Sequence, residues 1–188
     1  MTACRPTLAL GALALLLLAG PAQAQGQHHG GHRHGHGGPA TPYAGLQSRD
    51  IKALSDTEIA DLQAGRGMGL ALAAELNGYA GPMHALEHAD ALGLDAGQRA
   101  RMAQLMETMR ADAIAAGARL IAAERALDRL FAEAKASPEA VRAAVAAVAA
   151  AQGEVRAVHL VTHIAARDVL TPAQRDRYAV LRGYRAPG

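Results

Sequence analysis

The chain has 188 residues, and its 19 lysine and arginine residues nearly balance 17 aspartate and glutamate residues, for a formal net charge of +2. Such a balance indicates neither a nucleic-acid-binding protein nor a membrane-surface protein. Alanine, leucine, arginine and glutamate are abundant, whereas aromatic residues make up only 3%. This composition favours helices that pack through small residues over sheets.

Residues 1–24 have the pattern of a cleaved signal peptide. Arg5 precedes an apolar run that begins at Leu8, and Ala22-Gln23-Ala24 offers the small residues that a signal peptidase recognises. The run is shorter than the ~20 apolar residues that span a bilayer, and we expect no later segment to match it. We therefore expect a periplasmic protein without membrane insertion, cleaved near Ala24. Cys4, the one cysteine of the chain, lies in the signal, so we expect no disulfide after export.

Residues 25–42 form a tail rich in glycine and histidine, and we expect it to be disordered. Histidine-rich tracts bind metals loosely, but they also serve as solvated spacers, and both interpretations stay open here. The candidate accessory metal ligands of the tail are His28, His29, His32, His34 and His36.

Residues 43–188 are expected to form a single helical domain. Apolar side chains recur at helical spacing in every predicted element. The expected helices run from Ser55 to Asn77, from Pro82 to about Leu92, from Asp95 to about Lys135, from Pro138 to about Val169 and from Pro172 to Leu181. The prediction is an all-α fold, a hooked antiparallel hairpin of two long helices with short flanking helices, whose core covers about 82–185.

Three of the predicted helix starts carry a capping box. In this motif a Ser, Thr or Asp side chain caps the helix, and a Glu or Gln three residues later reaches back to it. The pairs are Ser55 with Glu58, Asp95 with Gln98, and Thr171 with Gln174.

The four histidines outside the tail form two pairs with the same spacing, His84 with His88 and His159 with His163. Residues four apart lie above one another on a helix, so both imidazoles of a pair can reach one ion. In the expected hairpin the two pairs meet at one end, where Glu107 is the expected nearest carboxylate. The alternative is that the second pair, on the apolar side of its helix, consists of core histidines that are satisfied by hydrogen bonds.

Sulfur ligands offer a softer alternative at the same end of the hairpin. Met106 lies one position from Glu107, and Met102, Met106 and Met109 could be interpreted as a copper-binding strip. Their spacing is that of a buried helix face, which we favour. A set of imidazoles with one carboxylate or thioether suits a divalent transition metal, namely Ni, Co, Zn or Cu, and does not suit Ca or Mg.

Two short motifs resemble those of a known family. Leu170-Thr171-Pro172-Ala173-Gln174 matches the LTxxQ motif of the Spy/CpxP superfamily of periplasmic proteins, and Leu94-Asp95-Ala96-Gly97-Gln98 is a near copy. Within that superfamily the histidine pattern is most similar to the CnrX-like periplasmic heavy-metal sensors, which have HxxxH, Glu and HxxxM elements. His84, His88 and Glu107 match the first two elements, and the third reads HxxxH, from His159 to His163.

The resemblance implies a periplasmic protein that senses or buffers heavy metals or confers resistance to them, with a possible membrane-bound signalling partner. It also supports an alternative, a chaperone or stress-response adaptor of the Spy/CpxP kind that binds unfolded clients without metal. In either case we expect a homodimer formed through the long helices. We expect no enzymatic activity, because the chain has no HExxH motif, no glycine-rich phosphate loop and no thiol nucleophile after export.

Overall fold

The computed structural model describes residues 42–186, where all regular structure is helical, so the predicted all-α fold is confirmed. The helices are η1 (Leu46–Ser48, a 3-10 turn), α1 (Asp56–Gln63), α2 (Leu72–Glu75), α3 (Pro82–Glu87), α4 (Ala89–Leu92), α5 (Ala96–Ala132), α6 (Pro138–Val169) and α7 (Pro172–Leu181). The predicted signal peptide and nearly all of the histidine-rich tail lie outside the described residues, and both stay predictions.

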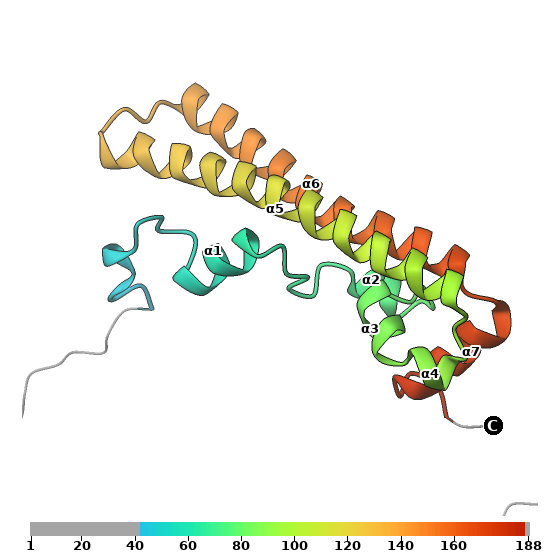
Figure 1. Ribbon diagram of the computed structural model, residues 1–188. Helices are drawn as coiled ribbons and strands as arrows, with labels where there is room; N and C mark the ends of the chain where they lie inside the picture. The colour runs from blue at the N-terminus through green and yellow to red at the C-terminus, as the bar shows by residue number, and fades with distance from the viewer. Residues whose placement is uncertain (1–41, 187–188) are drawn as a thin grey trace, which may run out of the picture. The chain divides into compact units, whose positions relative to one another are not determined.

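The long helices α5 and α6 form the predicted hairpin. They lie side by side and are joined by residues 133–137 (Figure 1). Each begins where the sequence signals a helix start: the Asp95 side chain accepts a hydrogen bond from a backbone amide at the start of α5, and Ser137 does the same ahead of Pro138 in α6.

The turn after α5 places an alanine in a left-handed conformation. Ala134 has a φ of 54°, and its amide donates to the carbonyl of Phe131 at 3.1 Å. The amide of Lys135 donates to the carbonyl of Leu130 at 2.8 Å. These two bonds complete a Schellman motif. Glycine usually occupies the left-handed position of this motif, because a side chain there destabilises the fold by about 1 kcal/mol.

The two motif copies contact each other at the hooked end of the hairpin. The Gln98 amide nitrogen donates to the Gln174 side-chain oxygen at 2.8 Å, and the Gln174 nitrogen donates back to Gln98 at 3.0 Å. Gln98 also donates to the carbonyl of Val169 at 2.9 Å. The leucines that open the two motifs, Leu94 and Leu170, are both buried in one apolar cluster. The motif therefore caps two helices and also joins them.

The N-terminal part departs from the prediction, because the single helix expected over 55–77 is wrong. The structure has two helices, α1 and α2, separated by residues 64–71. Gly65 and Gly69 have φ values of 65° and 74°, and Met68 has a φ of 43°. Glycine inside a helix costs about 1 kcal/mol relative to alanine, so a helical path here would be weak. The break turns this segment across the hairpin, where α1 contacts α5 and α2 contacts α6.

The described residues bury two separate apolar clusters. The hook cluster consists of Ala80, Ala85, Ala89, Leu92, Leu94, Met102, Ala166, Leu170 and Tyr178. The hairpin cluster consists of Ile51, Leu62, Ala116, Leu120, Ile121, Ala151 and Val155. Between them along the long helices lie the buried residues Met109 and Ala113 on α5 and His159 and His163 on α6. A polar stretch thus interrupts the core.

Helix α6 is also long and apolar enough to cross a membrane by length and composition, with a mean hydropathy of 1.2 in its most apolar window. This window is still less apolar than the run from Leu8 to Ala19, which contains only alanine and leucine apart from one glycine, so the expectation that no later segment matches that run is not contradicted. Core helices of soluble proteins meet the same criterion, and α6 packs along α5 and buries two histidines. The absence of membrane insertion stays a prediction.

Candidate metal centre

The buried face of α6 carries two imidazoles in an otherwise apolar stripe. Its buried residues are Ala151, Val155, His159, His163 and Ala166, which follow one face of the helix. His159 is only 2% exposed and His163 is 9% exposed. The predicted orientation of this pair towards the core is confirmed. Each buried ring nitrogen now needs a partner.

One ring nitrogen of His163 forms a hydrogen bond to the backbone, and this bond determines which nitrogen carries the proton. Its Nδ1 lies 2.7 Å from the carbonyl oxygen of Tyr79. Because a carbonyl only accepts, Nδ1 carries the proton, and in the neutral ring Nε2 keeps a lone pair. Gly81 makes room for this ring, since an added Cβ would lie 2.8 Å from Cε1 and 2.9 Å from Nε2. The ring is therefore positioned to bind an ion through Nε2.

His159, one turn earlier on α6, has a buried nitrogen without a partner. Its Nε2 makes no hydrogen bond in the described part of the chain. Burial lowers the pKa of His159, and the nearby His163 lowers it further. The neutral ring offers a lone pair in either tautomer, whereas an unpaired buried nitrogen costs about 1–3 kcal/mol. A ligand that accepts this lone pair would remove the cost.

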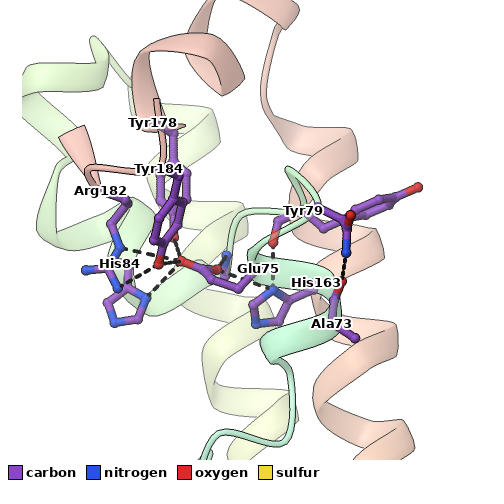
Figure 2. A network of polar contacts seen from close by, with 10 residues as sticks. Ala73, Glu75, Tyr79, His84, His163, Tyr178, Arg182 and Tyr184 are labelled. Atoms are coloured by element: carbon purple, nitrogen blue, oxygen red, sulfur yellow. Dashed lines mark hydrogen bonds and ion pairs between the residues drawn. The ribbon is translucent and has the colours of Figure 1, made fainter. Parts of the chain in front are cut away.

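Glu75, which the sequence analysis did not select, lies at the centre of the polar network (Figure 2). It is 6% exposed. Its Oε1 accepts hydrogen bonds from the hydroxyls of Tyr178 at 2.5 Å and Tyr184 at 3.0 Å. Oε2 accepts from the amide of Gly81 at 3.2 Å, and Arg182 Nε lies 3.5 Å from Oε1. Burial, together with the Glu75 carboxylate, raises the pKa of Tyr178, which keeps this phenol a neutral donor.

The same carboxylate lies between two histidines from different elements. Nδ1 of His84, on α3, is 3.6 Å from Oε1, and Nδ1 of His163, on α6, is 3.6 Å from Oε2 (Figure 2). Glu75 is the one charged residue in the apolar run from Leu70 to Leu76. A lone carboxylate inside such a run is the one signal that could have selected it, although Leu72 and Leu76 are exposed, so the run itself does not explain the burial of Glu75.

These groups open onto one pocket of about 640 Å³, which we call the histidine pocket. Its walls come from the segment between α1 and α2 and from α2, α3, α5 and α6. The donor side chains that line it are Glu75, His84, His159, His163, Met68, Met83, Met106 and Met109. One carboxylate, three imidazoles and four thioethers therefore share a single opening.

The structure brings together only part of the predicted ligand set. His88 lies half-buried at the junction of α3 and α4, where it does not line the histidine pocket, and Glu107 is exposed on α5 outside the pocket. The carboxylate nearest to His84 and His163 is Glu75 instead, because the break after α1 carries it onto the hairpin. Metal binding by His88, by Glu107 and by the tail histidines, which are outside the described residues, stays a prediction.

The donors fit a metal ion, but they do not form a closed shell as they stand. Within residues 42–186, no three His, Cys, Asp or Glu side chains are grouped closely enough to hold an ion. The fit rests on the unpartnered Nε2 of His159 and on Nε2 of His163, which keeps a lone pair because Nδ1 carries the proton. The second nitrogen of His163 is already bonded to a carbonyl, the arrangement that typically orients a metal-binding histidine.

Comparison with known proteins gives one match. A family described as heavy-metal resistance matches residues 64–177, which is more than half of the chain and includes every donor of the histidine pocket. Neither the curated proteins nor the solved structures contain a match. Tyr178, Arg182 and Tyr184, which hold Glu75, follow directly after the matched range.

Proposed function

The chain belongs to the heavy-metal resistance family, and from that premise we propose that it binds a transition-metal ion in the histidine pocket, in the periplasm. The observation that carries the proposal is the buried Nε2 of His159, which has no hydrogen-bond partner in the described part of the chain. In the tautomer protonated at Nδ1, this imidazole presents a lone pair at Nε2, and transition-metal ions bind such lone pairs.

The residues of the pocket have distinct roles in this proposal. His159 and His163 bind the ion through their Nε2 atoms, because Nδ1 of His163 is engaged with Tyr79. His84 supplies a third imidazole from α3. Glu75 lies 3.6 Å from nitrogens of both His84 and His163 and supplies the negative charge that lowers the cost of bringing in a cation. The predicted ions Ni, Co, Zn and Cu all accept such a donor set. When bound, the ion would supply a positive charge that accepts electron density from these lone pairs.

The cellular role that we propose is sensing, buffering or resistance towards heavy metals, as the resemblance to the CnrX-like sensors and the Spy/CpxP superfamily implies. The signal-like sequence that ends at Ala24 supports export. No enzymatic step is part of the proposal.

The proposal is tested by calorimetric titration of Ni, Co, Zn and Cu salts into the full chain and three variants. His159→Ala and His163→Ala are expected to lower the affinity of the tightest site strongly. His88→Ala is the matched control, because His88 does not line the pocket. The histidine-rich tail is present in every variant, so its loose binding cancels in the comparison. Equal affinities in all four proteins would contradict the proposal.

A second function is favoured by a separate observation. Large apolar side chains remain exposed along α2 and α6, with exposed fractions of 56% for Leu72, 61% for Leu76, 61% for Val161 and 51% for Ile164. Such side chains suit a homodimer interface or contact with unfolded clients, as in a Spy/CpxP-like chaperone. Suppression of client aggregation by the metal-free chain, lost when Val161 and Ile164 are replaced by Ser, would favour this alternative.

A further inference from the structure

Methionines are concentrated around the histidine pocket. The chain has six methionines, and four of them, Met68, Met83, Met106 and Met109, line this one opening. They come from three different parts of the chain: the break before α2, helix α3 and helix α5. The buried face of one helix does not explain thioethers that come from three separate parts of the chain and line the same pocket as three imidazoles.

The methionines of α5 lie on the expected buried face of the helix, since Met102 and Met109 are buried and Met106 is half-buried, but they divide between two environments. Met102 is fully buried in the hook cluster and serves as core. Met109 is 9% exposed and Met106 is half-buried, and both line the histidine pocket opposite α6. Both residues therefore form part of the pocket wall, whereas Met102 provides an internal reference that does not.

Met68 occupies a backbone position that favours glycine. Its φ of 43° lies in the left-handed region, and its neighbours on both sides are glycines. A side chain in this conformation costs roughly 1 kcal/mol, and glycine would avoid the cost. Strained residues of this kind cluster at ligand-binding sites. The strain places a thioether, 40% exposed, at the rim of the pocket.

The histidine pocket offers little negative charge to a bound cation. Glu75 is the one carboxylate among the residues that line it, and its charge is already shared with Arg182 at 3.5 Å. Arg66 and Arg110 also line the pocket, and Arg66 is paired with the carboxylate of Asp61. The cost of desolvating an ion rises with the square of its charge, and a buried ion needs compensation from opposite charge. Neither guanidinium compensates a cation, but a monovalent ion loses much less hydration free energy than a divalent ion when it enters such a pocket.

Resting on the proposed function, we propose that the histidine pocket selects a soft monovalent cation, Cu(I) or Ag(I), which is held by His159 Nε2 and by the thioethers of Met106 and Met109. Soft thioether ligands select Cu(I) over borderline divalent ions. Low coordination numbers satisfy such ions, so a closed shell of His, Cys, Asp and Glu is not required. Met68 and Met83 supply further thioethers at the rim.

The test uses the full chain with 13C-labelled methionine methyl groups, titrated with Ag(I), a redox-inert stand-in for Cu(I), and separately with Zn(II) and Ni(II). Ag(I) is expected to shift the methyl resonances of Met106 and Met109 and to leave that of Met102 in place. In calorimetry, the Met106→Leu/Met109→Leu variant is expected to lose Ag(I) affinity by about 10- to 100-fold, with Zn(II) affinity unchanged. Leucine conserves the side-chain volume, and Met102→Leu is the matched control.

The outcomes separate the two proposals. If Zn(II) or Ni(II) binds through His159 and His163 while Ag(I) leaves the Met106 and Met109 resonances unmoved, the soft-cation inference is overturned and the proposed function stands. If no cation shifts the methyl resonances of the pocket, and the His159→Ala and His163→Ala variants bind every cation as the wild type does, both are overturned. The methyl spectra of the wild-type chain alone decide whether Ag(I) reaches Met106 and Met109, so this arm of the test does not depend on the folding of any variant.

Discussion

Replacing Gly81 by alanine adds one methyl group at the point where the chain meets the His163 ring. An ideal Cβ at this position lies 2.8 Å from Cε1 and 2.9 Å from Nε2. Carbon atoms reach their best contact at about 3.5–4.0 Å, so the ring must withdraw by roughly 0.7–1 Å. The backbone at Gly81, with φ −82° and ψ 148°, suits alanine. The backbone therefore adds no strain, and the loss from this contact is offset only by the gain of about 0.4–1 kcal/mol from restricting the unfolded chain.

The withdrawal acts on both nitrogens of the ring. Nδ1 moves relative to the Tyr79 carbonyl, to which it is now bonded at 2.7 Å, and losing such a bond costs about 1 kcal/mol of the free energy of unfolding. Nε2 leaves its place in the pocket, and misplacement of a ligand lowers metal affinity by about 10- to 100-fold. We expect Gly81→Ala to show both losses together.

Urea unfolding and metal titration of Gly81→Ala measure the two quantities. Gly153→Ala is the matched control on α6, because an added Cβ there meets nothing within 4 Å. Alanine at this helical position should raise the free energy of unfolding by about 0.5–1 kcal/mol and leave metal affinity unchanged. A Gly81→Ala protein with wild-type stability and wild-type affinity would refute the argument that Gly81 seats the His163 ring.

Three further changes test other parts of the structure. Ala134→Gly should raise the free energy of unfolding by about 1 kcal/mol, because it relieves the left-handed alanine, and a lower urea midpoint would contradict this. Burial raises the pKa of Glu124 above its ordinary value of 4.5. At a pH above 4.5 the carboxyl ionises more readily in the unfolded chain than in the fold, and this destabilises the fold. Glu124→Gln should therefore stabilise the protein at pH 7, and the gain should disappear below pH 4.5; a gain that is independent of pH would exclude this cause. Tyr178→Phe removes the 2.5 Å hydrogen bond to buried Glu75 and should cost about 2 kcal/mol in urea unfolding, whereas an unchanged midpoint would show that the network does not stabilise the fold.

The parts of the fold that depend on local chemistry could be predicted from the sequence. Asp95 and Thr171 each form the capping box expected of them, because every partner lies within three residues. The observed bounds of α6 and α7 match the predicted bounds for the same reason. What the sequence did not reveal is that Gln98 and Gln174, each a cap of its own helix, also bond to each other across 76 residues.

The candidate site was predicted less completely, because it depends on tertiary contacts. The burial of His159 and His163 follows from their place on the apolar stripe of α6. The choice of Glu107 assumed a carboxylate from the hairpin itself. The structure supplies Glu75 from a segment that crosses the hairpin, and the left-handed residues that redirect this segment have no strong local signature.

The separation of the core into a hook cluster and a hairpin cluster has a consequence for the cooperativity of folding. Segments with their own apolar contacts open as separate units in hydrogen exchange, each with its own free energy. The histidine pocket lies between the two units, and its donors come from α3, from the segment before it, and from both long helices. An ion bound there would cross-link chain segments far apart in sequence, so the two units would open together. Metal binding would therefore slow the hydrogen exchange of amides far from any ligand.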